Sequence, residues 1–237
     1  MPAEHHLCAV CQQEATQRCS RCQETWYCSV EHQRQDWKEH KANVCLVEDP
    51  RVLQLVEAIT NNNRAVVEEL ASVPTVLNGK VASYNPSGRP LRKWAPLHEC
   101  VRAENLDLLQ LLLQKQPKLE VKDGDGETPL FIAASAREPR IVRALLTAGA
   151  NPNACGNDGW SALMMATRNA DLETVQAFFD SGVDVYAGHD MFGRSAVDFA
   201  QALATGQGLS VCEGEDFEEV LERARQMPAL YQAYLRA

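Results

Sequence analysis

Residues 128–131 read Thr-Pro-Leu-Phe, and related tetrapeptides recur on either side of them. These are Ala-Pro-Leu-His at 95–98, Ser-Ala-Leu-Met at 161–164 and Ser-Ala-Val-Asp at 195–198, spaced by 33, 33 and 34 residues. A fixed period of this length is typical of a repeat protein, in which each unit buries its apolar face against its neighbours. The chain of 237 residues therefore predicts a solenoid for most of its length.

Each of the first three tetrapeptides opens a short helical stretch that is followed by an amphipathic one: LDLLQLLLQ, RIVRALLTAGA and LETVQAFFDSGV. Glycines precede the tetrapeptides where a turn is needed, at Gly126, Gly159 and Gly193. Gly149 and Gly182 follow two of the second helices, where a residue with positive φ commonly ends a helix. The period thus predicts two helices and a glycine-containing turn in each unit.

This unit resembles the ankyrin repeat, whose Thr-Pro-Leu-His opening matches residues 95–98 and 128–131. The resemblance implies an all-α ankyrin-repeat solenoid with β-hairpin fingers, and a structural role for His98, which would form hydrogen bonds between turns. We expect about five units over residues 47–237, the first and last divergent. Residues 51–73 predict two short helices without the motif. The last unit is interrupted at 205–215, and we expect two further helices, over 216–226 and 227–237.

The amino-terminal part is a different kind of unit, because six of the nine cysteines lie in the first 45 residues. With two histidines they form four pairs with metal-ligand spacing: Cys8/Cys11, Cys19/Cys22, Cys28/His32 and His40/Cys45. Eight ligands suffice for two tetrahedral zinc sites without an open position, so the sites would be structural. Three disulfides are the alternative. Zinc is favoured because the histidines fall at ligand spacing and MPAEHHLCAV lacks the features of a secretion signal.

Residues 8–45 resemble a MYND finger in all eight ligand positions, in Tyr27-Cys28 and in the tail that contains Trp37. Spacing alone leaves sequential pairing of the ligands open. The resemblance implies a small two-zinc cross-brace over residues 1–46, with two structural Zn²⁺ ions. Zinc 1 would be held by Cys8, Cys11, Cys28 and His32, and zinc 2 by Cys19, Cys22, His40 and Cys45.

His32 stands where the commoner family pattern has cysteine, and here the finger is similar to that of oxygen-sensing prolyl hydroxylases. Such fingers bind short proline-containing peptides, including a Pro-x-Leu-Glu type. The resemblance makes Gln33 and Trp37 the candidate peptide-binding residues, with the indole stacking on proline and the amide bonding to the peptide backbone. The alternative is that Trp37 fills the small core between the zinc ions.

Four residues of the repeats are candidates for an interaction surface. Trp94 and Trp160 each precede a tetrapeptide, and tryptophan is enriched at binding hot spots. Met191 and Phe192 are apolar residues at an expected hairpin tip. The alternative for the tryptophans is packing along the hairpin.

The formal charge of −9 disfavours a nucleic-acid partner, since such partners are bound largely by neutralising phosphates. Arg89, Arg92 and Lys93 form a local basic exception, which we interpret as solvated surface. No apolar run approaches the roughly 18 residues of a membrane span. The sequence contains no phosphate-binding loop, H-E-x-x-H or G-x-S-x-G motif, so we expect no enzyme.

These features together predict an intracellular, monomeric protein–protein adaptor or scaffold, cytoplasmic or nuclear, with neither a nucleic-acid nor a membrane partner. Its finger would read a proline-containing peptide while the repeats hold a second protein. The alternatives are a ubiquitin-ligase component and a nuclear transcriptional co-regulator. The short junction at residues 46–50 predicts that the finger docks against the repeats in a fairly rigid arrangement.

Overall fold

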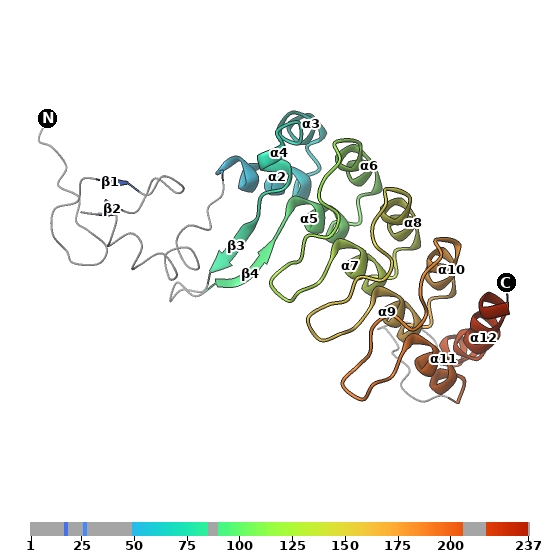
Figure 1. Ribbon diagram of the computed structural model, residues 1–237. Coiled ribbons are helices and arrows are strands. Elements are labelled where there is room, and N and C mark those ends of the chain that lie inside the picture. The colour runs from blue at the N-terminus through green and yellow to red at the C-terminus, as the bar shows by residue number, and fades with distance from the viewer. Residues whose placement is uncertain (1–16, 19–25, 28–48, 85–89, 206–216, 237) are drawn as a thin grey trace, which may run out of the picture.

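The structure is a computed structural model that describes residues 17–18, 26–27, 49–84, 90–205 and 217–236 (Figure 1). In the amino-terminal part, β1 (Gln17–Arg18) pairs antiparallel with β2 (Trp26–Tyr27). The predicted zinc ligands and peptide-binding residues lie outside the described residues: Cys8, Cys11, Cys19, Cys22, Cys28, His32, His40 and Cys45, with Gln33 and Trp37.

Helix pairs stacked in a row make up the repeats, with the connecting loops projecting from one side (Figure 1). This architecture confirms the ankyrin solenoid. The described pairs are α2 (Arg51–Thr60) with α3 (Arg64–Leu70), α5 (Pro96–Arg102) with α6 (Leu106–Gln114), α7 (Pro129–Ser135) with α8 (Pro139–Thr147), α9 (Ala162–Arg168) with α10 (Leu172–Asp180), and α11 (Ala196–Ala204) with α12 (Phe217–Arg236).

The tetrapeptides are helix starts, and this explains their composition. Thr128 is the N-cap of α7 and its hydroxyl accepts a hydrogen bond from the backbone N–H of Phe131 at 3.2 Å. Ser161 caps α9 in the same way, accepting from the N–H of Met164 at 3.3 Å. Pro129 occupies the first turn of α7, where its missing N–H costs nothing. The motif therefore recurs because the first helix of each unit begins at the same position of the tetrapeptide.

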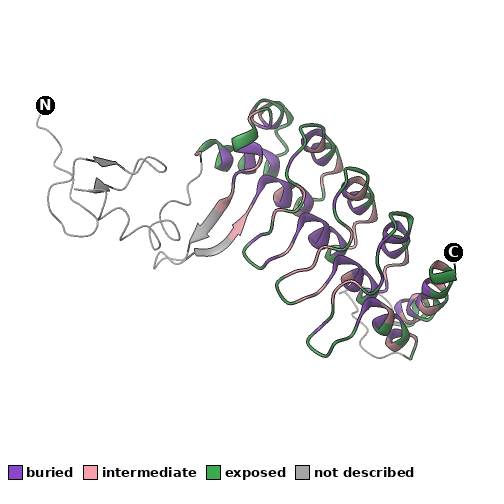
Figure 2. Cartoon of the chain, viewed as in Figure 1, coloured by how far each residue is buried: buried purple, intermediate pink, exposed green. Residues whose placement is uncertain are grey.

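A continuous core runs the length of the solenoid, from Val52 in α2 to Tyr231 in α12. The helices are buried where they face one another and exposed along the outer rim and the loop tips (Figure 2). At the carboxyl end, the ring of Phe179 stacks on Tyr234 and meets Tyr231 edge-on, with centroid distances of 4.2 and 5.0 Å. The buried Tyr231 hydroxyl also lies 2.5 Å from the hydroxyl of Thr167 in α9. Helix α12 thus closes the last open face of the stack.

The expectation of two separate helices at the carboxyl end is wrong, because α12 continues from Phe217 to Arg236 through Pro228. Val220, Ala224, Met227 and Tyr231 form one buried stripe that spans the proline. Burial of this stripe against α10 and α11 outweighs the local tendency of proline to end a helix.

The loop between the first two units was not anticipated from the sequence. It contains the short helix α4 (Pro74–Leu77) and a two-stranded ribbon of β3 (Val81–Tyr84) and β4 (Pro90–Trp94). Asn62 and Glu104, which occupy equivalent positive-φ turns in their units, are 42 residues apart, against 33 from Glu104 to Arg137. The first loop is therefore longer than those that follow. No helix in the described parts of the chain is long and apolar enough to cross a membrane.

Candidate functional site

The loops between later units are tight hairpins that project beside one another. The second hairpin, residues 123–127, is closed by a hydrogen bond from Asp123 N–H to the Glu127 carbonyl at 3.0 Å, and the third, residues 156–160, by one from Gly156 N–H to the Trp160 carbonyl at 2.8 Å. In the fourth hairpin, residues 190–194, the N–H of Asp190 donates to the carbonyl of Arg194 at 3.1 Å. Each hairpin therefore presents its two tip residues at an equivalent position.

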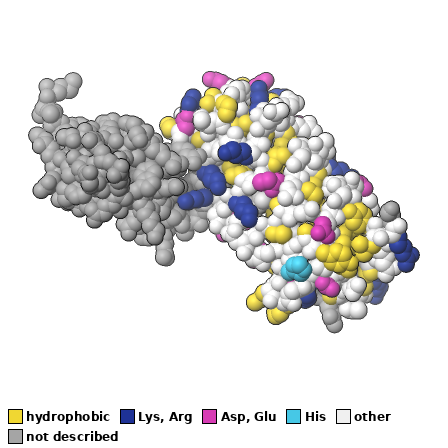
Figure 3. Space-filling view, in the orientation of Figure 1, with side chains coloured by type: hydrophobic (Ala, Val, Ile, Leu, Met, Phe, Trp, Pro, Cys, Tyr) yellow, Lys and Arg dark blue, Asp and Glu magenta, His cyan; other side chains and the backbone are white. Residues whose placement is uncertain are grey.

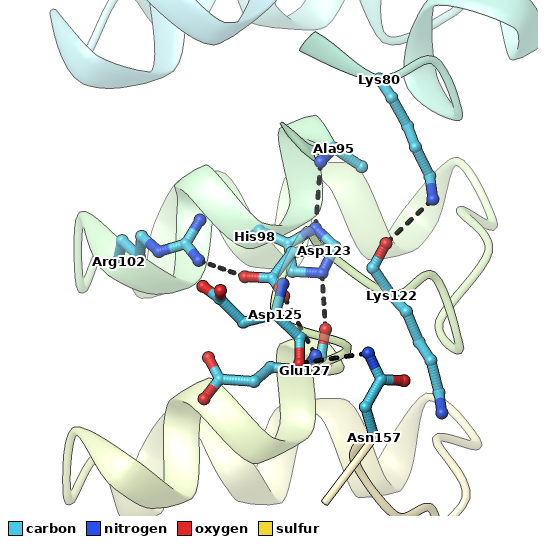
Figure 4. Close-up of polar contacts among 9 residues, drawn as sticks. All are labelled: Lys80, Ala95, His98, Arg102, Lys122, Asp123, Asp125, Glu127 and Asn157. Atoms are coloured by element: carbon cyan, nitrogen blue, oxygen red, sulfur yellow. Dashed lines mark hydrogen bonds and ion pairs between the residues drawn. The ribbon is translucent and has the colours of Figure 1, made fainter. Parts of the chain in front are cut away.

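Asp123 supports the second hairpin, residues 123–127, from inside (Figure 4). Its Oδ1 accepts hydrogen bonds from the N–H groups of Asp125 and Glu127, both at 3.0 Å. Its Oδ2 accepts from Nη2 of Arg102 in α5 at 2.7 Å, and the side chain of Asp123 is completely buried. Helix α5 of the second unit thus fixes the hairpin that leads into the third unit.

His98 provides a second connection between these units (Figure 4). Its Nδ1 accepts from the N–H of Ala95 at 3.0 Å, so in the neutral ring Nε2 carries the proton and donates to the Glu127 carbonyl at 3.2 Å. Burial lowers the pKa of His98 to about 4. The ring is therefore neutral at pH 7, and these bonds agree with its expected structural role.

Lysines tie the loops into a ladder. Nζ of Lys80 donates to the carbonyl of Lys122 at 2.9 Å, and Nζ of Lys122 donates to the carbonyl of Cys155 at 2.9 Å. The amide of Asn157 donates to the Asp125 carbonyl at 3.4 Å. The hairpins accordingly form one connected surface. Sequence reasoning missed this ladder, because it joins residues one repeat apart through backbone acceptors.

The fourth hairpin has the same internal support but a different tip. Oδ1 of Asp190 accepts from the N–H groups of Phe192 and Arg194 at 2.9 Å, and Oδ2 accepts from Nε of Arg194 at 2.8 Å. Burial alone would raise the pKa of Asp190, but the hydrogen bonds from Arg194 and the backbone hold it below its usual value. The tip residues are Met191 and Phe192, with 87% and 74% of their surfaces exposed.

This apolar tip contrasts with the equivalent tips of the two preceding hairpins, which carry Gly124-Asp125 and Asn157-Asp158. The guanidinium carbon of Arg194 lies 5.3 Å from the centre of the Phe192 ring and 4.7 Å from that of Phe199. Arg194 therefore packs behind the exposed ring and supports it.

The two candidate tryptophans are placed differently from the apolar tip. Trp160 is half-buried, with its ring centre 5.0 Å from that of Phe199 and 5.7 Å from the guanidinium carbon of Arg168. Trp94 is half-buried at the end of β4, and its buried Nε1 has no hydrogen-bond partner among the described residues. Trp160 thus packs against the repeats beside Phe199, whereas Trp94 lies at the end of β4 in the first loop.

Within the described ranges no group of three or more His, Cys, Asp or Glu residues could hold a metal ion. Cys100 is buried, which raises the pKa of its thiol to about 12. The predicted zinc ligands all lie before position 49, outside the described residues.

Comparison with known families identifies both modules. The MYND finger model matches residues 8–45, and the model of three ankyrin repeats matches residues 97–189. A MYND finger is a zinc-binding domain, so a zinc-binding segment precedes the repeats. Both modules mediate protein–protein interactions.

The curated relatives match parts of the chain. NF-kappa-B inhibitor delta from Mus musculus is 39% identical over 74 residues, which are 31% of this chain and 23% of that protein. Protein phosphatase 1 regulatory subunit 27 from Homo sapiens is 38% identical over 79 residues, 33% of this chain and 48% of that protein. Egl nine homolog 1 from Homo sapiens is 51% identical over 39 residues, 16% of this chain and 9% of that protein, which supports the prolyl hydroxylase-like character of the finger. The chain therefore spans less than half of the length of each of these relatives.

Proposed function

We propose that this chain, in which a MYND finger precedes ankyrin repeats, is a non-enzymatic adaptor that holds two protein partners. The finger module would comprise residues 1–46 and the repeat module residues 47–237, in a monomer. The observation that carries the proposal is the supported apolar tip of the fourth hairpin, Met191 and Phe192. Two relatives named as an inhibitor and as a regulatory subunit are also proteins whose names describe action on another protein.

The finger would supply the first binding site. Its donor set of six thiolates and two imidazoles fits two tetrahedral Zn²⁺ ions, because both donor types are preferred zinc ligands. The cross-braced sets are Cys8, Cys11, Cys28 and His32 for zinc 1, and Cys19, Cys22, His40 and Cys45 for zinc 2. The metal would stabilise a segment that is too small for a substantial apolar core.

On the finger, Gln33 and Trp37 are the proposed contacts for a short proline-containing segment. Segments of the Pro-x-Leu-Glu type are one class of such ligands. An indole offers a flat apolar face to a proline ring, and the Gln33 amide can both donate to and accept from a peptide backbone.

On the repeats, the second partner would bury Met191 and Phe192 in an apolar pocket. An exposed aromatic ring beside an exposed methionine provides a large apolar contact area. Because Asp190 and Arg194 already fix the loop, little conformational entropy is lost when the partner binds. Trp94 and Trp160 would contribute to the repeat surface mainly as packing residues, since both are half-buried.

Affinity purification followed by mass spectrometry tests the two sites separately. The baits are the wild-type chain, Trp37→Ala, the double variant Met191→Ser/Phe192→Ser, and a control, Leu235→Ser, at a side chain that is 49% exposed on α12. We expect Trp37→Ala to lose one set of partners with zinc content unchanged, and the double variant to lose a different set. The control should keep both.

Retention of every partner by both the Trp37→Ala and the Met191→Ser/Phe192→Ser variants would contradict the proposal. Transfer of ubiquitin by the purified chain with a panel of conjugating enzymes would favour the ubiquitin-ligase alternative instead.

A further inference from the structure

Lys80, Lys93 and Lys122 lie together where the first two loops leave the repeats. Lys80 directly precedes β3, Lys93 belongs to β4, and Lys122 directly precedes the second hairpin. The carbonyl of Lys93 accepts a hydrogen bond from the N–H of Gly124 at 2.7 Å, so β4 lies beside the loop that carries Lys122. We call these three residues the basic row. Figure 3 shows Lys and Arg side chains gathered over this end of the visible face.

The ladder bonds fix the spacing of two of these charges. The ammonium groups of Lys80 and Lys122 are each held against a carbonyl of the following unit, and both side chains lie on the same side of the hairpin, opposite Arg102 (Figure 4). The two ammonium groups occupy equivalent positions in adjacent units. They are therefore about 10 Å apart, which is the distance between the axes of packed helices. The bond to Cys155 uses one of three N–H donors of the exposed Lys122.

The basic row is a local exception on an acidic protein whose formal charge is −9. Glu120 is a carboxylate on the same loop as Lys122, and its Oε1 accepts from the N–H of Asn151 at 2.8 Å. A nucleic acid carries a charge at every nucleotide and would extend from the row onto acidic surface. A short peptide with two or three carboxylates would match the row alone.

We propose that the basic row binds an acidic segment of a partner protein in which carboxylates recur at every third residue. In the polyproline II conformation the chain rises about 3.1 Å per residue with three residues per turn, so side chains at i and i+3 share a face about 9 Å apart. That interval matches the step between Lys80 and Lys122, and Lys93 adds a third positive charge. This site is separate from the finger and from the fourth hairpin.

Two fluorescently labelled peptides of identical composition test the proposal on the full-length, zinc-loaded chain. One is Glu-Ser-Gly-Glu-Ser-Gly-Glu, and the other has its three glutamates adjacent, Ser-Gly-Glu-Glu-Glu-Ser-Gly. Both lack proline, which keeps the experiment independent of the proposed finger ligand. By fluorescence anisotropy at about 50 mM salt, we expect the spaced peptide to bind more tightly, and its affinity to fall as salt is added.

Variants locate the interaction. Lys93→Gln and Lys122→Gln should each weaken binding of the spaced peptide by about two- to fivefold, as expected for exposed charge pairs. Lys115→Gln, at the end of α6, removes the same charge elsewhere and should leave binding unchanged. Thermal unfolding of each variant identifies any loss that follows from a broken ladder bond, and Lys93→Gln removes no side-chain ladder bond. Equal affinity for the two peptides, an equal effect of Lys115→Gln, or tighter binding of a single-stranded RNA heptamer would overturn the proposal.

Discussion

At the scale of single residues, His98 couples the stability of the repeats to pH. Its ring is buried and neutral, and its pKa in the folded protein is about 4, against about 6.5 for an unperturbed histidine. Between these two values the unfolded state binds the proton and the folded state does not. The contribution of His98 is therefore complete above pH 6.5 and is lost as the pH falls toward 4, by up to about 3 kcal/mol.

Denaturant unfolding at several pH values measures this effect. The free energy of unfolding of His98→Gln should fall less steeply than that of the wild type between pH 6.5 and pH 4, although the variant is less stable at pH 7 because hydrogen bonds are lost. His189→Gln is the matched control, and it should keep the wild-type slope. Parallel pH profiles for the wild type and His98→Gln would show that another group accounts for the acid sensitivity.

Gly159 is required for close approach of two hairpins as well as for its backbone conformation. Its φ is +84°, and an added Cβ would lie 2.6 Å from the carbonyl oxygen of His189. Gly182 has a similar φ of +73° with nothing within 4 Å of an added Cβ. We expect Gly182→Ala to cost about 1–2 kcal/mol from the left-handed conformation alone, and Gly159→Ala to cost clearly more, because a backbone oxygen must move.

Urea unfolding of the two glycine variants separates conformational strain from the steric conflict. The difference between their free energies of unfolding reports the contact between the third and fourth hairpins. Equal losses for Gly159→Ala and Gly182→Ala would mean that the hairpins move apart without cost.

At the scale of elements, α12 contains an internal destabilising residue. Pro228 has no N–H to donate to the carbonyl of Ala224, one turn earlier, and it is half-buried within the helix. We expect Pro228→Ala to stabilise the chain by about 1–3 kcal/mol, because the helix regains a hydrogen bond and a residue of higher helix propensity. Pro129→Ala, in the first turn of α7, should not stabilise, since no bond is regained there.

Circular dichroism and thermal unfolding of these two proline variants make the comparison. Pro228→Ala should raise the melting temperature and keep or increase the helical signal. A lower melting temperature for Pro228→Ala would indicate that the ring contributes more by packing than it costs the helix.

The helix pairs could be predicted from the sequence because the signals that specify them are local and periodic. Thr128, Pro129 and Gly149 each mark a helix boundary within one unit. Met191 and Phe192 could be placed at a hairpin tip from the sequence, because they lie just before Gly193 and the tetrapeptide at 195–198. The predicted helix boundary near Pro228 is wrong because proline locally favours the end of a helix. In the folded protein, burial of Met227 and Tyr231 favours a helix that continues through this position.

The connections between units could not be predicted, because they depend on which residues the fold brings together. Nothing in the sequence pairs Arg102 with Asp123 or Thr167 with Tyr231, since those partners meet only after the helices stack. The β3–β4 ribbon lies in the first loop, which is longer than the later loops. Its residues therefore have no equivalents in the other units from which its structure could be predicted. Spacing did predict metal ligands before position 49, where residues 8–45 match a MYND finger.

At the scale of the whole molecule, the question is how metal binding by the finger affects the repeats. Only residues 46–50 separate the last predicted ligand, Cys45, from α2, and Leu53 on that helix remains 49% exposed. A finger docked on this end of the solenoid would protect α2 when zinc is bound. Solenoid units interact mainly with their nearest neighbours, so the effect should fade along the row.

Hydrogen–deuterium exchange with and without a zinc chelator measures this coupling in the full chain. After chelation we expect faster amide exchange at residues 8–45, a smaller increase in α2 and α3, and no change in α9 and α10, because local opening depends on neighbouring contacts. The Cys8→Ser variant, which removes one predicted ligand, should reproduce part of the pattern without a chelator. Unchanged exchange in α2 would show that the two modules fold independently, whereas faster exchange in every unit would show that zinc supports the whole solenoid.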